Sequence, residues 1–255
     1  MIVTAALLWF DEPVDMLAEA VRSVGGFADR IVAVDGGYAR YPGGTASSPP
    51  EQADAIRTAA REAGLDCRVV VPDRVWAGQI EKRSAMYAIA IEGSDWLMSL
   101  SADDLAVGDP ASVREQLAAT GYDAMDVAFY TPPGTAQAST LWAENLIGST
   151  ERIAYFFRAL PGFRCEDRHW HYSAMKGEQR VWLYGPPGGR YPVAEHGAID
   201  GDFQIVHRTM SRQPKQILAN RAFCNDRVMV VEMTGQEDDQ PDLPRPVWDY
   251  ESRLV

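Results

Sequence analysis

Cysteine is scarce in this chain of 255 residues: Cys67, Cys165 and Cys224 are its only three, and they lie far apart in the sequence. An odd number of cysteines without a CxxC pair argues against a disulfide framework or a zinc ribbon. It is typical of a protein kept in a reducing compartment, so we expect a cytoplasmic location.

Basic residues are also fewer than acidic residues. The chain has 24 Lys and Arg residues against 36 Asp and Glu residues, a net charge of −12. Duplex nucleic acid is bound through a basic face, so we expect no direct nucleic-acid partner. A local basic pocket for a small phosphate ligand is compatible with this balance.

Long hydrophobic runs are missing as well. The apolar start at residues 2–10 lacks a basic segment before it and is too short to cross a bilayer. We interpret it as a strand and expect no membrane span.

The first hundred residues alternate between strand and helix patterns. Apolar runs predict strands at 2–10, 30–35, 67–71 and 95–101. Helical spacing predicts helices at 12–26, 50–64 and 79–93. This order predicts an α/β, Rossmann-like fold with a mostly parallel sheet and helices on both faces.

Two carboxylates are expected at one edge of this sheet. Asp35 ends the second predicted strand and Asp103 follows the fourth. Ligands of such sheets bind beyond the carboxyl ends of the strands, so both residues should face one crevice.

The second half of the chain predicts a smaller mixed α+β portion. A helix is expected at 111–120, then strands at 126–131, 151–160, 180–185 and 203–209, and a last helix at 212–233. No linker interrupts the chain, so we divide one domain into halves 1–110 and 111–233. The acidic, proline-rich residues 234–255 are expected to form an extended tail.

Asp103 and Asp104 are adjacent carboxylates directly after a buried strand pattern. They repel each other unless a cation or hydrogen-bond donors satisfy them. Oxygen ligands of this kind suit Mg²⁺ or Mn²⁺. The alternative is a solvated turn in which the side chains cap backbone N–H groups.

The chain has four histidines, and three are candidates for chemistry. His207 lies in an apolar strand pattern that runs into the basic residue Arg208. His169 and His171 alternate, so on a strand they would share one face. Each histidine could instead be a hydrogen-bonded structural residue.

The order of motifs resembles GT-A-fold glycosyltransferases of the family 2 type. The resemblance rests on "VTAALLWFDEPVDMLAEAVRSVGGFADRIVAVDGG" at residues 3–37 and "GQIEKRSAMYAIAIEGSDWLMSLSADDL" at residues 78–105. It covers residues 1–110 well and the remainder loosely. It implies a GT-A-like fold in which 1–110 binds a nucleotide sugar and 111–233 binds the acceptor.

The resemblance also assigns roles to residues of the first half. Asp35 matches the aspartate that contacts the nucleoside of the donor, and the backbone from Ala5 to Leu7 would cradle the base. Lys82 or Arg83 matches the basic position near the ribose and diphosphate. Asp103 matches the last acid of the D-x-D motif, which reaches the metal.

The implied metal is Mn²⁺ or Mg²⁺, with Asp103, Asp104 and His207 as ligands. Arg208 would contact the diphosphate. Ser101 stands where the family has the first acid of D-x-D and is placed among the donor contacts. Asp104 compensates for this departure, or metal affinity is reduced, or the enzyme works without metal.

Inverting glycosyl transfer needs a carboxylate near the acceptor hydroxyl to take its proton. Glu166 and Asp167 are the candidates, and Glu144 is a further one. An acidic pair in a loop is also common solvated surface, and a retaining enzyme would need no such base.

The expected function is transfer of a sugar from a nucleotide-diphosphate sugar, UDP first, to an acceptor hydroxyl on a glycan, lipid, small molecule or protein. A sugar nucleotidyltransferase is an alternative, although residues 7–15 lack the glycine-rich phosphate loop and lysine that it would normally show. A non-catalytic nucleotide- or glycan-binding protein is a second alternative, which Ser101 keeps open. Association with a second copy through the tail is also left open.

Overall fold

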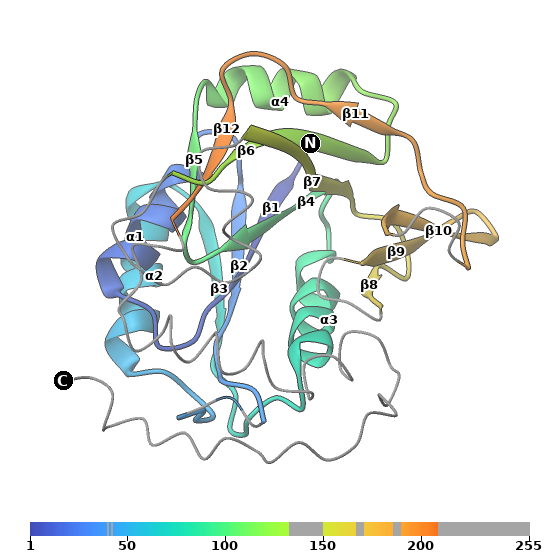
Figure 1. The fold of residues 1–255 in the computed structure, drawn as a ribbon. Coiled ribbons are helices and arrows are strands. Elements are labelled where there is room, and N and C mark those ends of the chain that lie inside the picture. The colour runs from blue at the N-terminus through green and yellow to red at the C-terminus, as the bar shows by residue number, and fades with distance from the viewer. Residues whose placement is uncertain (40, 42, 133–149, 167–170, 186–189, 209–255) are drawn as a thin grey trace.

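The computed structural model describes residues 1–39, 41, 43–132, 150–166, 171–185 and 190–208. Its first part alternates strands and helices, as expected (Figure 1). These elements are β1 (Val3–Leu8), α1 (Val14–Ser23), β2 (Arg30–Val34), α2 (Pro50–Glu62), β3 (Asp66–Val70), α3 (Gln79–Ala90) and β4 (Trp96–Ser101).

The later elements complete one large sheet and form a second, smaller one. Those of the large sheet and its cover are β5 (Asp104–Val107), α4 (Pro110–Ala119), β6 (Ala124–Tyr130), β7 (Thr150–Arg158), β11 (His196–Ala198) and β12 (Gln204–His207). Those of the three-stranded sheet are β8 (Arg164–Cys165), β9 (Tyr172–Lys176) and β10 (Gln179–Tyr184).

The large sheet has the strand order β3-β2-β1-β4-β7-β6-β12-β5, with β11 paired to β6. Strands β1 to β4 are parallel to one another, β7 is antiparallel to both neighbours, and β5 is antiparallel to β12. Leu8 of β1 pairs with Val34 of β2 and with Ser101 of β4. The carboxyl ends of β2 and β4 therefore lie at the same edge, one strand apart, as predicted.

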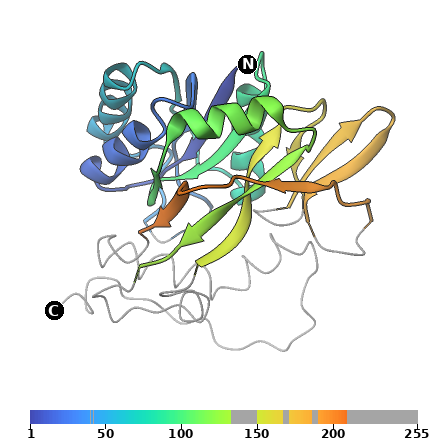
Figure 2. The ribbon, with the colours of Figure 1, turned by 90° about the horizontal axis from the view of Figure 1, so that it is seen from above.

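Helices cover both faces of the sheet (Figures 1 and 2). Because side chains alternate along a strand, Trp96 of β4 packs in the layer with α1, α2 and α4, whereas Leu97 packs in the layer with α3 and the three-stranded sheet. Both side chains are fully buried. The predicted α/β fold, with a mostly parallel sheet and helices on both faces, is confirmed.

Local sequence signals account for several element ends. The Asp109 carboxylate accepts a hydrogen bond from Ala111 N (3.0 Å) and caps α4, with Pro110 in the first turn. After α2, Gly64 takes a φ of 72°, a conformation that glycine adopts without a side-chain clash.

Four short strands differ from the prediction, which named no strand for β5, β8, β9 or β11. They have two to five residues, too few to show a period. The predicted helix 212–233 and the tail 234–255 lie outside the described residues, so they stay predictions, as does the division into halves. Among the described helices, none combines the length and apolar character needed to cross a membrane.

A histidine–aspartate pair joins β11 to β6. His196 Nδ1 lies 2.9 Å from an Asp126 carboxylate oxygen, and both side chains are largely buried. This hydrogen bond raises the pKa of His196, with burial opposing it and the Asp126 charge adding to it. The protonated histidine thus stabilises the folded chain.

We expect replacement of His196 by Asn to cost more stability at about pH 5.5 than at about pH 8.5, by roughly 1 kcal/mol. Since the folded-state pKa is raised above the unfolded value of about 6.5, the stabilisation is complete below that value and is lost as pH rises through the folded-state pKa. Urea unfolding of both proteins at the two pH values measures the difference. An equal cost at both would contradict this role.

Candidate functional site

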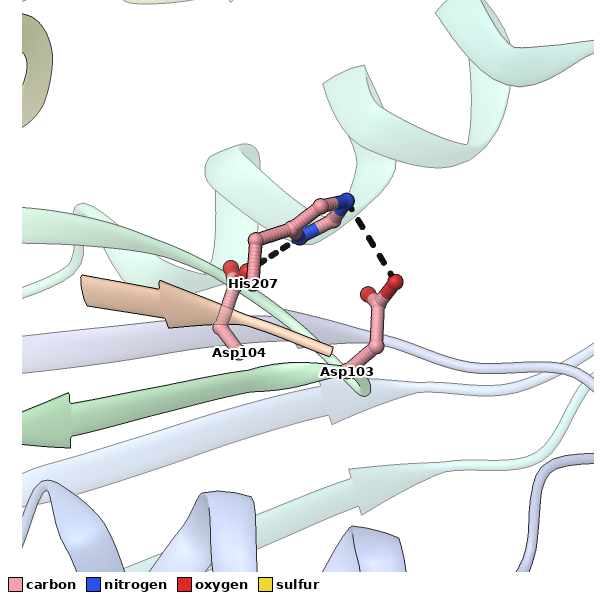
Figure 3. A group of neighbouring side chains, drawn as sticks. All are labelled: Asp103, Asp104 and His207. Carbon is pink, nitrogen blue, oxygen red and sulfur yellow. Dashed lines mark hydrogen bonds and ion pairs between the residues drawn. The ribbon is translucent and has the colours of Figure 1, made fainter. Parts of the chain in front are cut away.

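Asp103, Asp104 and His207 form a compact group at the carboxyl ends of β4 and β12 (Figure 3). The antiparallel pairing of β12 with β5 places His207 directly opposite Asp104. Arg208 N donates a hydrogen bond to the Asp103 carbonyl (2.7 Å), which continues the pairing past the end of β12. Backbone hydrogen bonds therefore position all three side chains.

The Asp104 carboxylate is fully buried and accepts hydrogen bonds at both oxygens. Oδ1 lies 2.8 Å from His207 Nδ1, while Oδ2 accepts from Ser101 N (2.8 Å) and the Tyr155 hydroxyl (3.0 Å). Burial raises the pKa of Tyr155 well above 10, and the Asp104 charge adds to the effect. The hydroxyl therefore remains protonated and acts as a donor.

Asp103 is also buried, at 1% exposure, and its Oδ2 lies 3.5 Å from His207 Nε2. One donor atom from each of Asp103, Asp104 and His207 lies within 4.8 Å of the others. Two ligands each ~2.1 Å from one cation are ~3.0–3.5 Å apart, so the Asp103–His207 separation fits a shared ion. Two buried carboxylates also favour a cation. The residues therefore fit a divalent metal.

Arg208 follows His207 directly in the chain and carries a guanidinium group. Its Nη1 donates to a Glu19 carboxylate oxygen on α1. Its Nε and Nη2 are buried and have no hydrogen-bond partner among the described residues. Unpaired buried donors cost free energy, and an anionic ligand at this position would satisfy them.

Asp35 lies at the end of β2, as predicted, and its carboxylate holds a loop. It accepts hydrogen bonds from Gly36 N (2.6 Å), Ser48 N (2.7 Å) and Ser48 Oγ (2.5 Å). Trp76 Nε1 donates to the Asp35 carbonyl (2.7 Å). The buried carboxylate thus anchors the segment that leads to α2, and its nucleoside role stays a prediction.

Lys82 is buried at 1% exposure, and its ammonium group joins the ends of β1 and β2. Nζ donates to the carbonyls of Trp9 (2.7 Å) and Gly36 (2.6 Å) and lies 5.4 Å from the centre of the Tyr38 ring. Burial lowers the pKa of Lys82 to about 7, although the Asp35 charge opposes this. These contacts indicate a structural role for Lys82 in holding two strand ends together. Its contact with the nucleotide sugar stays a prediction.

The contacts of Arg83 and of β1 give little support to their predicted roles in binding the nucleotide sugar. Arg83 Nη1 approaches the Tyr172 hydroxyl of the three-stranded sheet (3.3 Å). The side chains of Ala5 and Leu7 lie in the core, and β1 is paired with β2 on one side and β4 on the other. The backbone from Ala5 to Leu7 is thus engaged in sheet pairing, and its role as a cradle for a base stays a prediction.

Glu166 follows β8 directly, and positive side chains contact its carboxylate. Its carboxylate accepts from Arg164 Nε (2.8 Å), Arg190 Nη2 (2.8 Å) and Ser173 Oγ. Burial raises the pKa of Glu166, but the hydrogen bonds from Arg164 and Ser173 and the arginine charges outweigh it and lower the pKa. A carboxylate stabilised in this way is a weak proton acceptor, so these contacts do not support the predicted general base.

His171 is buried beside the Trp182 ring, 5.7 Å between ring centres, and its carbonyl accepts from Glu166 N. It belongs to the three-stranded sheet rather than to the group around Asp103. Asp167, His169 and Glu144 lie outside the described residues, and their roles stay predictions.

Tyr155 and Ser48 are site residues that the sequence reasoning missed. The Tyr155 hydroxyl donates a hydrogen bond to Asp104, and the Ser48 hydroxyl donates one to Asp35. In each case the donor comes from a segment distant in the sequence. Residues 151–160 read as an aromatic strand, and that pattern does not single out one hydroxyl. No local signal identifies Ser48.

No protein-family model matches the chain, and no curated protein matches it. Among solved structures, a Bacillus anthracis protein assigned as a glucose-1-phosphate thymidylyltransferase, in complex with sucrose, is 11% identical with a TM-score of 0.42. That match covers 62% of this chain and 72% of the other. TarS of S. aureus is 10% identical with a TM-score of 0.35, over 55% of this chain and 23% of TarS. Similarity at this level carries no inference about function.

Replacing Ser48 by Ala should lower the free energy of unfolding by about 1–3 kcal/mol, because the buried Asp35 carboxylate loses its hydroxyl donor. The neighbouring Ser47→Ala variant is the matched control and should change it by less than about 0.5 kcal/mol. Chemical denaturation of the three proteins tests this. Equal stability of the two variants would show that the anchor is unimportant.

Proposed function

We propose that the protein is a metal-assisted glycosyltransferase that uses a nucleotide-diphosphate sugar, with UDP the first nucleotide to test. The observation that carries the proposal is the buried Asp103–Asp104–His207 group at the carboxyl edge of a mostly parallel sheet. Ligands of such sheets bind at this edge. The resemblance of residues 1–110 to family 2 glycosyltransferases supports the choice of donor.

The chain's own residues have distinct tasks in this proposal. Asp103 and His207 hold the divalent ion, Mn²⁺ or Mg²⁺, and the buried Asp104 supports them. A bound ion would supply positive charge to the diphosphate as the bond to the sugar breaks. Arg208 supplies N–H donors to the same leaving group, since two of its nitrogens have no partner within the part of the chain that the structure describes.

Ser101 bears on the metal requirement. Its backbone N–H binds Asp104, so this residue supports the group through its main chain. A serine side chain supplies no charge to an ion. The negative charge of the site therefore comes from Asp103 and Asp104, which is why we retain a metal in the proposal.

Calorimetric titration with UDP and Mn²⁺ should give saturable binding to the wild-type protein that disappears without metal. The Asp103→Asn variant should lose at least about tenfold in affinity for the pair, because one charged ligand becomes neutral. Asp66→Asn, an exposed aspartate on β3, is the matched control and should bind like wild type. Absence of heat with UDP, GDP and other nucleoside diphosphates would remove the proposal.

The released product distinguishes the proposed reaction from nucleotidyl transfer. A glycosyltransferase, supplied with a panel of nucleotide sugars, releases nucleoside diphosphate, whereas a sugar nucleotidyltransferase supplied with sugar phosphate and nucleoside triphosphate releases pyrophosphate. We expect the first product, detected by chromatography. Pyrophosphate release instead would establish the alternative, and tight binding without either product would favour a non-catalytic protein.

The Arg208→Gln variant should bind UDP about 10- to 100-fold more weakly, as expected for loss of charged hydrogen bonds worth about 1.5–3 kcal/mol. UMP binding should change less, because the terminal phosphate is missing. Glu19→Gln, which alters only the partner of Arg208 Nη1, is the control. Equal losses for UDP and UMP would contradict a diphosphate contact.

A further inference from the structure

We propose that Asp104 is a positioning residue: it holds His207 in the tautomer that carries its proton on Nδ1, so that Nε2 is the nitrogen offered to the metal. This inference rests on the metal site of the proposed function. It divides the predicted ligand set into two metal-binding residues, Asp103 and His207, and one residue that acts through His207.

The distances from the His207 ring to the two carboxylates are unequal. Nδ1 lies 2.8 Å from Asp104 Oδ1, which is a normal hydrogen-bond length. Nε2 lies 3.5 Å from Asp103 Oδ2, which is longer than an N–H···O hydrogen bond and fits two ligands of one ion. Figure 3 shows the ring between the two carboxylates, with one nitrogen toward each.

Asp104 contacts protein groups through both of its carboxylate oxygens. Oδ2 receives both Ser101 N and the Tyr155 hydroxyl, and Oδ1 faces His207. The side chain is fully buried. These three contacts fix the carboxylate in place and direct Oδ1 at His207 Nδ1.

An ionised carboxylate can only accept hydrogen bonds, so the nitrogen facing Asp104 must carry a proton. In the neutral imidazole the other nitrogen then has the lone pair, and here that nitrogen is on the Asp103 side. Metal-binding histidines are commonly oriented by a carboxylate on their second nitrogen, which also makes them better ligands. Asp104 meets this requirement by geometry.

The ring has little freedom to exchange its nitrogens. Phe129 packs against it with ring centres 5.1 Å apart, and the β5–β12 pairing fixes the backbone of His207 opposite Asp104. Rotation of the ring would break the Asp104 contact. The tautomer is therefore the property that Asp104 controls.

The Asp104→Asn variant tests this directly, because it keeps the shape of the side chain and replaces one acceptor oxygen by an NH₂ donor. The asparagine oxygen can occupy the Oδ2 position, where two donors meet it, and its NH₂ group then faces His207 Nδ1. This arrangement makes Nδ1 the acceptor and moves the proton to Nε2. The variant is expected to fold, since Ser101 and Tyr155 keep their partner.

The first measurement is ¹⁵N NMR of histidine-labelled protein without metal at about pH 8.5, where an ordinary histidine is neutral. The His207 signals are assigned with a His207→Gln variant. We expect the Nδ1–H tautomer in the wild type and the Nε2–H tautomer in Asp104→Asn. An Nε2–H tautomer in the wild type would overturn the inference.

The second measurement is metal binding. We expect Asp104→Asn to bind Mn²⁺ about 10- to 100-fold more weakly by electron paramagnetic resonance titration. With ¹¹³Cd²⁺ bound to the wild type, coupling should appear to Nε2 of His207. Coupling to Nδ1, or wild-type Mn²⁺ affinity in Asp104→Asn, would contradict the inference.

Tyr155→Phe is the matched control, since it removes a donor from Asp104 Oδ2 and leaves the His207 contact. We expect the Nδ1–H tautomer and a Mn²⁺ affinity close to wild type. A change of tautomer in this variant would contradict the assignment to Asp104. If wild type has the expected tautomer but binds no Mn²⁺, the metal site itself fails, and the NMR result separates that failure from an error in the tautomer.

Discussion

The hydrogen bond between Asp104 and His207 joins two segments 103 residues apart, and the candidate site depends on it. The chain leaves β4 at the middle of the sheet and enters β5 at its far edge, next to β12. Because β5 and β12 run antiparallel, the first residue of one lies opposite the last residue of the other. Sheet pairing thus places a partly buried imidazole beside two buried carboxylates.

Several other buried charges have protein partners that compensate them. The Asp35 carboxylate receives three donors from its own loop, and the Lys82 ammonium group donates to two carbonyls. Glu166 is surrounded by arginines. At Asp103 and Asp104, two buried carboxylates lie beside the imidazole of His207, and a divalent cation would balance their charge.

Much of the fold could be predicted from the sequence, because its signals are local. The alternation of strands and helices up to β4, the Asp109–Pro110 start of α4 and the position of Asp35 and Asp103 at one edge all follow from patterns within a few residues. The four-residue strand β5 was not predicted, because its only support is pairing with a strand about a hundred residues later.

The difference between local sequence signals and tertiary contacts also explains which candidate site residues could be expected to lie together. Asp103, Asp104 and His207 were grouped from the resemblance, and the structure brings them together. The burial of Lys82 and the arginine partners of Glu166 depend on tertiary contacts that have no local pattern. Ala5 to Leu7 could be recognised as a strand, but its central place in the sheet came only from the strand order.

The most direct test of the account is anomalous diffraction at the manganese edge from crystals grown with UDP and Mn²⁺. We expect one strong peak within about 2.3 Å of an Asp103 carboxylate oxygen and His207 Nε2, with the diphosphate on the same ion. A peak at another place in the molecule, or ordered nucleotide with no peak beside Asp103, would contradict it.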